Sequence, residues 1–207
     1  LKALAGKVRA SCLLAHVRGV AYSTDVTISL QNTHPFTFAG CRLGLAHNGD
    51  LHRIAEYRDD LARETKPAFR RQVAGTTDSE WIAALLVSRL ADPQAYSAAE
   101  LEQAVLETLA IIGAARQRAG VATSSSVNLF ISDGELALGV RHCFDYGRYA
   151  THDPTRVNEA NLRYLSLWYT LGHDFGLHEN EWKMVGAEDA ADAVIIASEP
   201  LTADHTS

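Results

Sequence analysis

The segment Leu45-Ala46-His47-Asn48-Gly49-Asp50 joins a short apolar run to a pair of residues that can take part in chemistry. An asparagine amide beside a glycine backbone N–H can stabilise a developing negative oxygen, as an oxyanion hole does. The same Asn48-Gly49 step is also favoured in tight type I′ turns, because both residue types tolerate positive φ angles. A hairpin turn and an oxyanion hole are therefore the two interpretations of this step.

Two charged side chains are candidates for binding the charged groups of a substrate. Arg18 follows a short apolar run, and a guanidinium at the end of a strand can hold a carboxylate through two parallel hydrogen bonds. Asp78 could bind an ammonium group, although an aspartate in the first turn of a helix also interacts favourably with the helix dipole. For both residues, a purely structural role is the alternative interpretation.

The histidines and cysteines give weaker indications of function. His34 and His47 lie beside turn-like elements, where a histidine more often packs or hydrogen-bonds than acts as a base. The chain has no His-Glu-x-x-His arrangement and no cysteine pair near its histidines, so we expect no metal site and no cofactor. Cys12, Cys41 and Cys143 are expected to be free thiols, because three cysteines in 207 residues do not indicate a disulfide framework.

The composition is that of an ordinary globular protein, with 47% hydrophobic residues and a formal net charge of −6. This charge argues against a nucleic-acid partner, which would need a basic face. No apolar run approaches the roughly 18 residues needed to cross a bilayer, so we expect no membrane span. The low cysteine content favours a reducing compartment, and a cytoplasmic location is the prediction.

The order of the predicted elements is strands, then two long helices, then more strands, which is typical of an α+β layered domain. The apolar patterns predict strands over 13–17, 42–46, 127–131, 135–141, 165–171 and 194–197, and helices over 51–64, 77–90 and 98–118. Thr77 and Glu80 have the spacing of a capping box at the start of a helix. A doubly wound nucleotide-binding fold is disfavoured, since no phosphate-binding loop or dinucleotide fingerprint occurs.

Five short segments, in the same order along the chain, resemble the motifs of the class II glutamine amidotransferases, and in particular the compact γ-glutamyl amide hydrolases of ergothioneine and glutathione metabolism. These segments are Ala15-His16-Val17-Arg18, Asn32-Thr33-His34-Pro35-Phe36, Ala46-His47-Asn48-Gly49, Gly75-Thr76-Thr77-Asp78-Ser79-Glu80 and Ala197-Ser198-Glu199-Pro200-Leu201-Thr202. The resemblance covers nearly the whole chain, so residues 1–207 are predicted to be one domain of this type. It implies an N-terminal-nucleophile hydrolase fold, a four-layer αββα sandwich.

The resemblance also implies a reaction and a role for each matching residue. The protein would cleave the γ-amide of glutamine or of a γ-glutamyl compound through a thioester on an N-terminal cysteine, whose own α-amine is the base. Asn48 and the Gly49 N–H would form the oxyanion hole. Arg18 would hold the α-carboxylate of the substrate and Asp78 its α-ammonium, a pair of fixed charges that recognises an amino acid. The substrate-binding residues implied by the motifs are Arg18, His47, Thr77 and Asp78.

The chain departs from the family pattern in two places. In the family, the nucleophilic cysteine opens the mature chain several dozen residues before the first motif, whereas only 17 residues precede Arg18 and none of the three cysteines matches that position. We therefore expect the nucleophile segment to be missing. We also expect part of the C-terminus to be missing, because the strand signal at 194–197 is followed by only ten residues. Secondly, Gly19-Val20-Ala21-Tyr22 follows Arg18, where the family usually has small residues and a threonine that helps to bind the carboxylate.

Three interpretations of the activity follow from the resemblance. A glutaminase would release ammonia to a synthase partner, whereas a γ-glutamyl amide hydrolase would act alone on a larger substrate. Either of these two enzymes could be a homo-oligomer. The alternative from another class is a non-catalytic protein of the same fold that binds a γ-glutamyl ligand or a partner chain.

Overall fold

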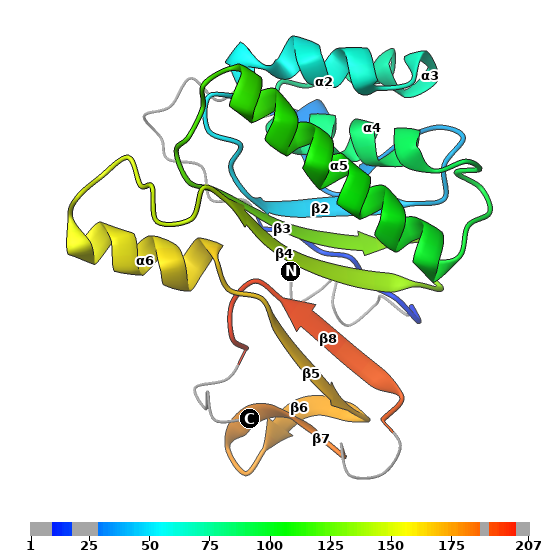
Figure 1. The fold of residues 1–207 in the computed structure, drawn as a ribbon. Helices are drawn as coiled ribbons and strands as arrows, with labels where there is room; N and C mark the ends of the chain where they lie inside the picture. The colour runs from blue at the N-terminus through cyan, green and yellow to red at the C-terminus, as the bar shows by residue number, and fades with distance from the viewer. Residues whose placement is uncertain (1–9, 18–28, 187–190, 202–207) are drawn as a thin grey trace. The chain divides into compact units, whose positions relative to one another are not determined.

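A computed structural model of the chain describes residues 10–17, 29–186 and 191–201, and these form an α+β fold (Figure 1). The strands are β1 (Phe36–Thr37), β2 (Gly44–Gly49), β3 (Ser125–Ser132), β4 (Ala137–Phe144), β5 (Trp168–Gly172), β6 (Asp174–His178), β7 (Glu181–Val185) and β8 (Ala193–Ala197). The helices are α2 (Arg58–Glu64), α3 (Pro67–Arg70), α4 (Asp78–Arg89), α5 (Ala98–Arg118) and α6 (Pro154–Tyr164), with the short 3-10 helices η1 (Leu30–Asn32) and η2 (Ile54–Glu56).

The chain divides into two compact units, and each is described by itself. Among the described residues, unit 1 comprises 10–17, 29–47, 53–121 and 130–138, and unit 2 comprises 48–52, 122–129, 139–186 and 191–201. One sheet has the strand order β1-β2-β3-β4, and its strands β2, β3 and β4 contribute residues to both units. In unit 1, β1 and β2 are antiparallel, with Phe36 opposite Leu45.

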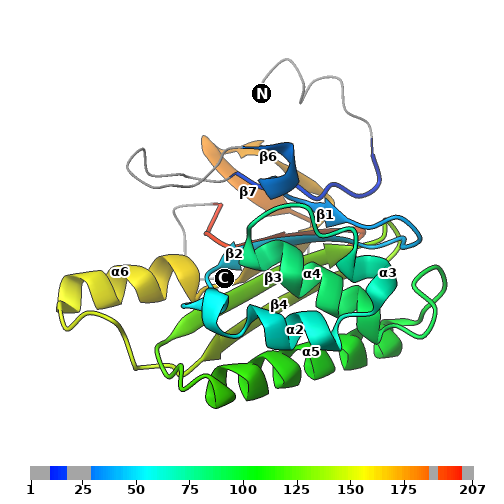
Figure 2. The same cartoon turned by 90° about the horizontal axis from the view of Figure 1, so that it is seen from above.

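Helices cover the strands of unit 1. α4 and α5 pack against each other, α2 packs across both, and α4 also contacts β1 (Figures 1 and 2). The helical period places one apolar stripe of α5 inside the core, whereas α4 is buried over most of its surface. Apolar side chains that α4 and α5 bury are Ile82, Leu85, Leu86, Leu101, Val105 and Ile112. Full burial of each such side chain stabilises the fold by roughly 1.5–3 kcal/mol.

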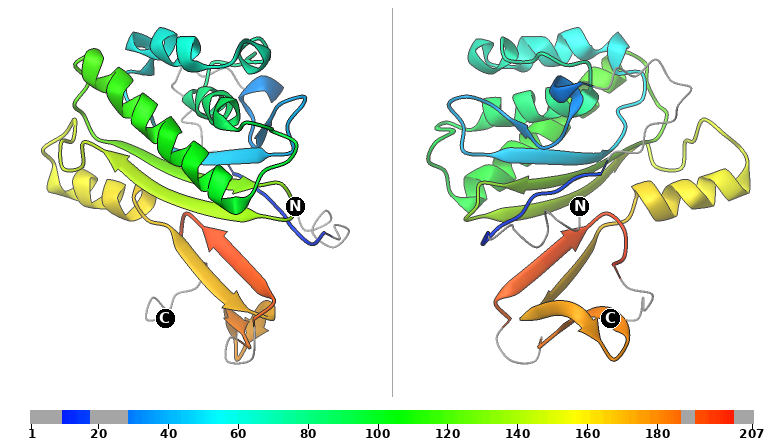
Figure 3. Two further views of the ribbon diagram at one scale, coloured as in Figure 1. Left: turned by 45° about the vertical axis from the view of Figure 1, so that its right-hand side comes forward. Right: turned by 180° about the vertical axis from the view of Figure 1, so that it is seen from behind.

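Two antiparallel strand pairs belong to unit 2, and Figure 3 shows both. β5 pairs with β8 along its whole length, and β6 and β7 form a hairpin that contacts β5. Gly139 of β4 lies close to β8, because a Cβ atom at this glycine would be only 2.9 Å from Cγ2 of Ile196. The absence of a side chain at Gly139 therefore leaves room for the Ile196 side chain of β8.

The two long helices predicted from the sequence are confirmed as α4 and α5, whereas one predicted strand is wrong and one predicted helix is shorter than expected. Residues 13–17 form no strand, although they alternate in burial: Leu13 and Val17 are 74% and 88% exposed, and Leu14 contacts Gly44. An apolar pattern can predict an extended chain, but a strand also needs a hydrogen-bonded neighbour. The helix predicted over 51–64 begins only at Arg58, because Arg53 has a left-handed φ of 56°.

Helix α6 and the β6–β7 hairpin were not predicted from the apolar pattern. α6 has polar residues on most of its surface, and its start is marked instead by Asp153, whose carboxylate accepts a hydrogen bond from the Thr155 N–H, and by Pro154. No helix in the described part of the chain is both long and apolar enough to cross a membrane.

Candidate functional site

Asn48 and Gly49 are the last two residues of β2, and both have extended strand conformations. Of the two interpretations of this step, the type I′ turn does not occur, because such a turn requires a positive φ at both residues and Asn48 does not have one. Gly49 has a φ of 151°, in a region that glycine reaches more easily than other residues. The step therefore ends a strand.

The side-chain amide of Asn48 has a defined neighbour in unit 2. Its Oδ1 accepts a hydrogen bond from Nδ2 of Asn128, a fully buried residue of β3, at 3.5 Å. Nδ2 of Asn48 has no acceptor among the described residues. The amide thus presents its N–H donors away from Asn128, as an oxyanion hole requires.

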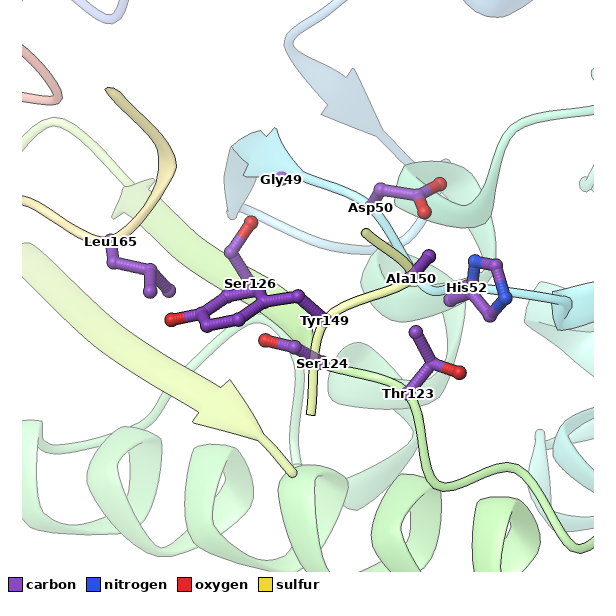
Figure 4. Close-up of a pocket in the computed structure, with 9 residues that line it drawn as sticks. All are labelled: Gly49, Asp50, His52, Thr123, Ser124, Ser126, Tyr149, Ala150 and Leu165. Carbon is purple, nitrogen blue, oxygen red and sulfur yellow. The ribbon is translucent and has the colours of Figure 1, made fainter. Parts of the chain in front are cut away.

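A pocket of about 400 Å³ lies within unit 2, and Gly49 is one of the residues that line it (Figure 4). Its lining residues are Gly49, Asp50, His52, Thr123, Ser124, Ser126, Tyr149, Ala150 and Leu165. Most of these side chains are polar, and four carry hydroxyl groups. The Tyr149 hydroxyl donates to Oδ1 of Asn161, and burial raises the pKa of Tyr149, so its phenol stays protonated at neutral pH. The sequence patterns gave no sign of this pocket, because its residues come from four separate segments.

Three candidate residues lie in unit 1 at or near the start of α4. Thr77 is the N-cap of this helix, and its hydroxyl accepts from the Glu80 N–H at 3.2 Å. Asp78 follows, and its Oδ1 accepts from the N–H of Ser79 at 2.8 Å and from the Ser79 hydroxyl at 3.2 Å. Nδ1 of His47, a residue only 2% exposed, lies 3.0 Å from the same Ser79 hydroxyl.

Ser79 therefore links two residues that the motifs assign to substrate binding. Its hydroxyl has one proton, which it donates to Asp78, so it accepts the proton of His47 Nδ1. This arrangement indicates the Nδ1–H tautomer of His47. The sequence alone did not point to Ser79, because a serine in the first turn of a helix is common.

The loop before α4 is held by two buried polar side chains. The Glu80 carboxylate accepts from the Ala74 N–H at 2.9 Å and from the Gly75 N–H at 2.7 Å. Asn32 accepts from the Thr76 N–H at 2.9 Å and donates to the Thr76 hydroxyl at 3.2 Å. These bonds fix the backbone that leads into Thr77 and Asp78.

The predicted capping box at this helix is only half formed. The Thr77 hydroxyl accepts from the Glu80 N–H, but the Glu80 carboxylate binds the loop at Ala74 and Gly75 instead of the Thr77 N–H. A complete capping box occurs at α5, where the Glu100 carboxylate accepts from the N–H of Ser97. The loop before α4 supplies two N–H donors, and these bind Glu80.

The other candidate residues from the sequence are Arg18, His34 and any group that could bind a metal ion. Arg18 lies outside the described residues. The His34 ring packs against the rings of His16 and Phe36, at centroid distances of 4.0 and 4.7 Å, as expected for a packed histidine. In the described part of the chain, no three His, Cys, Asp or Glu residues are grouped so that they could hold a metal ion.

The three cysteines are free thiols. Cys12 lies 3.1 Å from the Ser132 hydroxyl, and Cys143 lies 3.3 Å from the Ser124 hydroxyl. Burial raises the pKa of the Cys41 thiol, which makes it a weak nucleophile.

Comparison with known proteins gives the family. A family model described as "Glutamine amidotransferases class-II" matches residues 3–162. The chain is 28% identical over 216 residues to the probable glutamine amidotransferase DUG3 of Saccharomyces cerevisiae, covering 98% of this chain and 55% of that protein. It therefore spans about half the length of this curated relative.

A solved structure of a glutamine aminotransferase class-II domain protein from Silicibacter pomeroyi is 20% identical, with a TM-score of 0.49, over 70% of this chain and 56% of that one. The family model covers most of the sequence and includes four of the five motifs, from Ala15 to Glu80. The chain belongs to the class II glutamine amidotransferase family.

Proposed function

We propose that this protein is an amidohydrolase that cleaves the γ-amide of glutamine or of a γ-glutamyl compound, through a thioester on an N-terminal cysteine. The observation that carries the proposal is the end of β2, where Asn48 Nδ2 has no acceptor among the described residues and stands next to the Gly49 N–H. Two such donors can stabilise the oxyanion that forms when a thiolate attacks an amide carbonyl. Family membership supports the same reaction.

In this proposal, the remaining motif residues bind the amino-acid end of the substrate. Arg18 holds the α-carboxylate, and Asp78 holds the α-ammonium. His47, from the third motif, and Thr77, from the fourth, also bind this end of the substrate. Support comes from the Ser79 contacts, which orient Asp78 and link it to His47. We expect Asp78→Asn to raise KM more than it lowers kcat, since the α-ammonium is bound equally in the ground and transition states.

The pocket that Gly49 helps to line favours a γ-glutamyl compound over free glutamine. Glutamine releases ammonia, which needs almost no room, whereas a conjugate releases a larger amine. A pocket of about 400 Å³ with several hydroxyl groups can hold such a leaving group. Values of kcat/KM for glutamine and for γ-glutamyl amides of increasing size test this preference.

The nucleophile in this proposal has a free α-amine, so it is the first residue of the mature natural protein. Cys12, Cys41 and Cys143 are internal and do not meet that requirement. N-terminal sequencing of the natural protein is expected to begin with cysteine. Any other first residue would overturn the thioester mechanism.

We also propose that residues 1–207 belong to one domain with the four-layer αββα arrangement of the N-terminal-nucleophile hydrolases. The helices of unit 1 that cover its strands support one outer layer. The close approach of Gly139 to Ile196 within unit 2 supports two sheets packed face to face. A crystal structure of the natural protein would test the layering directly.

The decisive experiment measures glutamate release by the natural full-length protein and its Asn48→Ala variant. Removal of one oxyanion donor should lower kcat by about 10²-fold or more with little change in KM. Asn158→Ala, at an exposed position on α6, is the matched control and should retain wild-type kcat. Undiminished turnover by Asn48→Ala would overturn the assignment, and ligand binding without turnover by the wild type would favour the non-catalytic alternative.

A further inference from the structure

A line of hydrogen bonds in unit 2 leads from the last sequence motif to Asn48. The Ser166 hydroxyl donates to the Ser198 carbonyl oxygen at 2.9 Å. Nδ2 of Asn128 donates to the Ser166 carbonyl oxygen at 2.9 Å and to Oδ1 of Asn48 at 3.5 Å. Asn128 has no exposed surface, so this contact is made without competition from bulk water.

The backbone carbonyl decides which way both amides point. A carbonyl oxygen can only accept, so the nitrogen of the Asn128 amide must face Ser166. The second proton of the same nitrogen then points to Asn48, and only the oxygen of the Asn48 amide can receive it. The Asn48 nitrogen is consequently turned to the opposite side.

An asparagine amide without such a neighbour could present either its oxygen or its nitrogen to the substrate. An oxygen in this position would repel an oxyanion, whereas the nitrogen stabilises it. An oxyanion hole that uses an asparagine side chain therefore requires something that fixes the amide in one of its two orientations.

We infer that Asn128 is a positioning residue, which takes its own orientation from the Ser166 carbonyl and holds the Asn48 amide with its N–H donors toward the oxyanion. This inference rests on the proposed function of Asn48. It also gives the last motif a structural task, because Ser198 anchors Ser166.

Asn128→Asp tests the inference with almost no change in shape. When ionised, the aspartate has no donor for Oδ1 of Asn48, so the Asn48 amide should rotate and donate to the new carboxylate. We expect kcat to fall by about 10²-fold, close to the value for Asn48→Ala, with KM changed less than about threefold. Asn158→Asp is the matched control, since the same replacement at an exposed position of α6 should leave kcat unchanged.

A double variant separates positioning from a general structural role. If Asn128 acts only through Asn48, then Asn48→Ala combined with Asn128→Asp should have the kcat of Asn48→Ala alone. A further loss that equals the effect of Asn128→Asp in the wild type would overturn the inference. Unchanged kcat in Asn128→Asp would also overturn it.

Asn128→Leu covers the case in which a buried aspartate prevents folding. It leaves the Asn48 amide without a partner that selects one orientation, so kcat should fall by about tenfold in the wild type and not at all in Asn48→Ala. A leucine variant that melts as the wild type does and keeps full kcat would refute the positioning role. Failure of the wild-type protein to cleave any γ-amide would refute the proposed function instead, so the two failures are distinguishable.

Discussion

Glu80→Gln should destabilise the protein although it changes a single atom. Glu80 is only 5% exposed, and each of its carboxylate oxygens accepts one backbone N–H, from Ala74 and from Gly75. A glutamine keeps one oxygen for one of these donors. Its NH₂ group then faces the other backbone N–H, and no hydrogen bond can form because both groups are donors.

The magnitude follows from the hydrogen bonds that are lost. A hydrogen bond to a charged group contributes about 1.5–3 kcal/mol, and Glu80→Gln removes one such bond and weakens the other. Water can reach part of the loop, because Ala74 is exposed, so we expect a loss of about 2 kcal/mol. In a chain of this size, that lowers Tm by about 4–8 °C. Because the loop leads into Thr77 and Asp78, KM should rise as well.

Glu100→Gln is the matched control for this experiment. Glu100 occupies the same position of its helix as Glu80 and also accepts two hydrogen bonds, both from Ser97, but it is exposed to solvent. Its replacement should change stability by less than about 0.5 kcal/mol. Thermal and urea unfolding of both variants measure the difference. Equal shifts in Tm would refute the argument that Glu80 stabilises the loop through buried hydrogen bonds.

Three further predictions concern other parts of the chain. Gly75→Ala should cost about 2 kcal/mol in urea unfolding, because its Cβ would lie 2.6 Å from the Gln31 carbonyl oxygen; an unchanged midpoint would contradict this. Burial lowers the pKa of His142 below 6.5, so the unfolded chain binds a proton more readily, and stability should fall as the pH drops below about 6.5. The Tm of His142→Gln should therefore fall less between pH 7 and 5.5 than the Tm of the wild type. Identical dependence of Tm on pH in the two proteins would contradict this prediction. The raised pKa of Cys41 should make its alkylation at pH 8 slower than that of free cysteine, as measured by peptide mass spectrometry.

The long helices α4 and α5 could be predicted from the sequence because their signals are local. Ser97 and Glu100 define the start of α5, and the apolar residues that follow at helical spacing define its buried face. Strand pairing depends on residues distant in the chain, and residues 13–17 show the consequence. Their side chains alternate in burial as in a strand, yet no ladder forms in the described part of the chain.

The motif residues of the candidate site could also be recognised from the sequence, but the residues that support them could not. Nothing near Asn128 in the sequence indicates that its side chain contacts Asn48, and nothing near Ser79 indicates that its hydroxyl contacts His47. Such contacts join segments up to 80 residues apart, and only folding brings them together. The same holds for Tyr149, whose place in the pocket has no local signal.

Several motif residues support the backbone or a neighbouring side chain, and they do so in both units of the chain. In unit 1, Asn32 of the second motif and Glu80 of the fourth hold the loop from Ala74 to Thr76 by backbone hydrogen bonds. In unit 2, Ser198 of the last motif anchors Ser166, whose carbonyl orients the amides that lead to Asn48. Asn32 and Glu80 are buried polar side chains that must satisfy their hydrogen bonds, so both are tied to one geometry, whereas Ser198 acts through its backbone carbonyl. The spacing of the motifs therefore reflects the positioning of Asp78 and Asn48 as much as their chemistry.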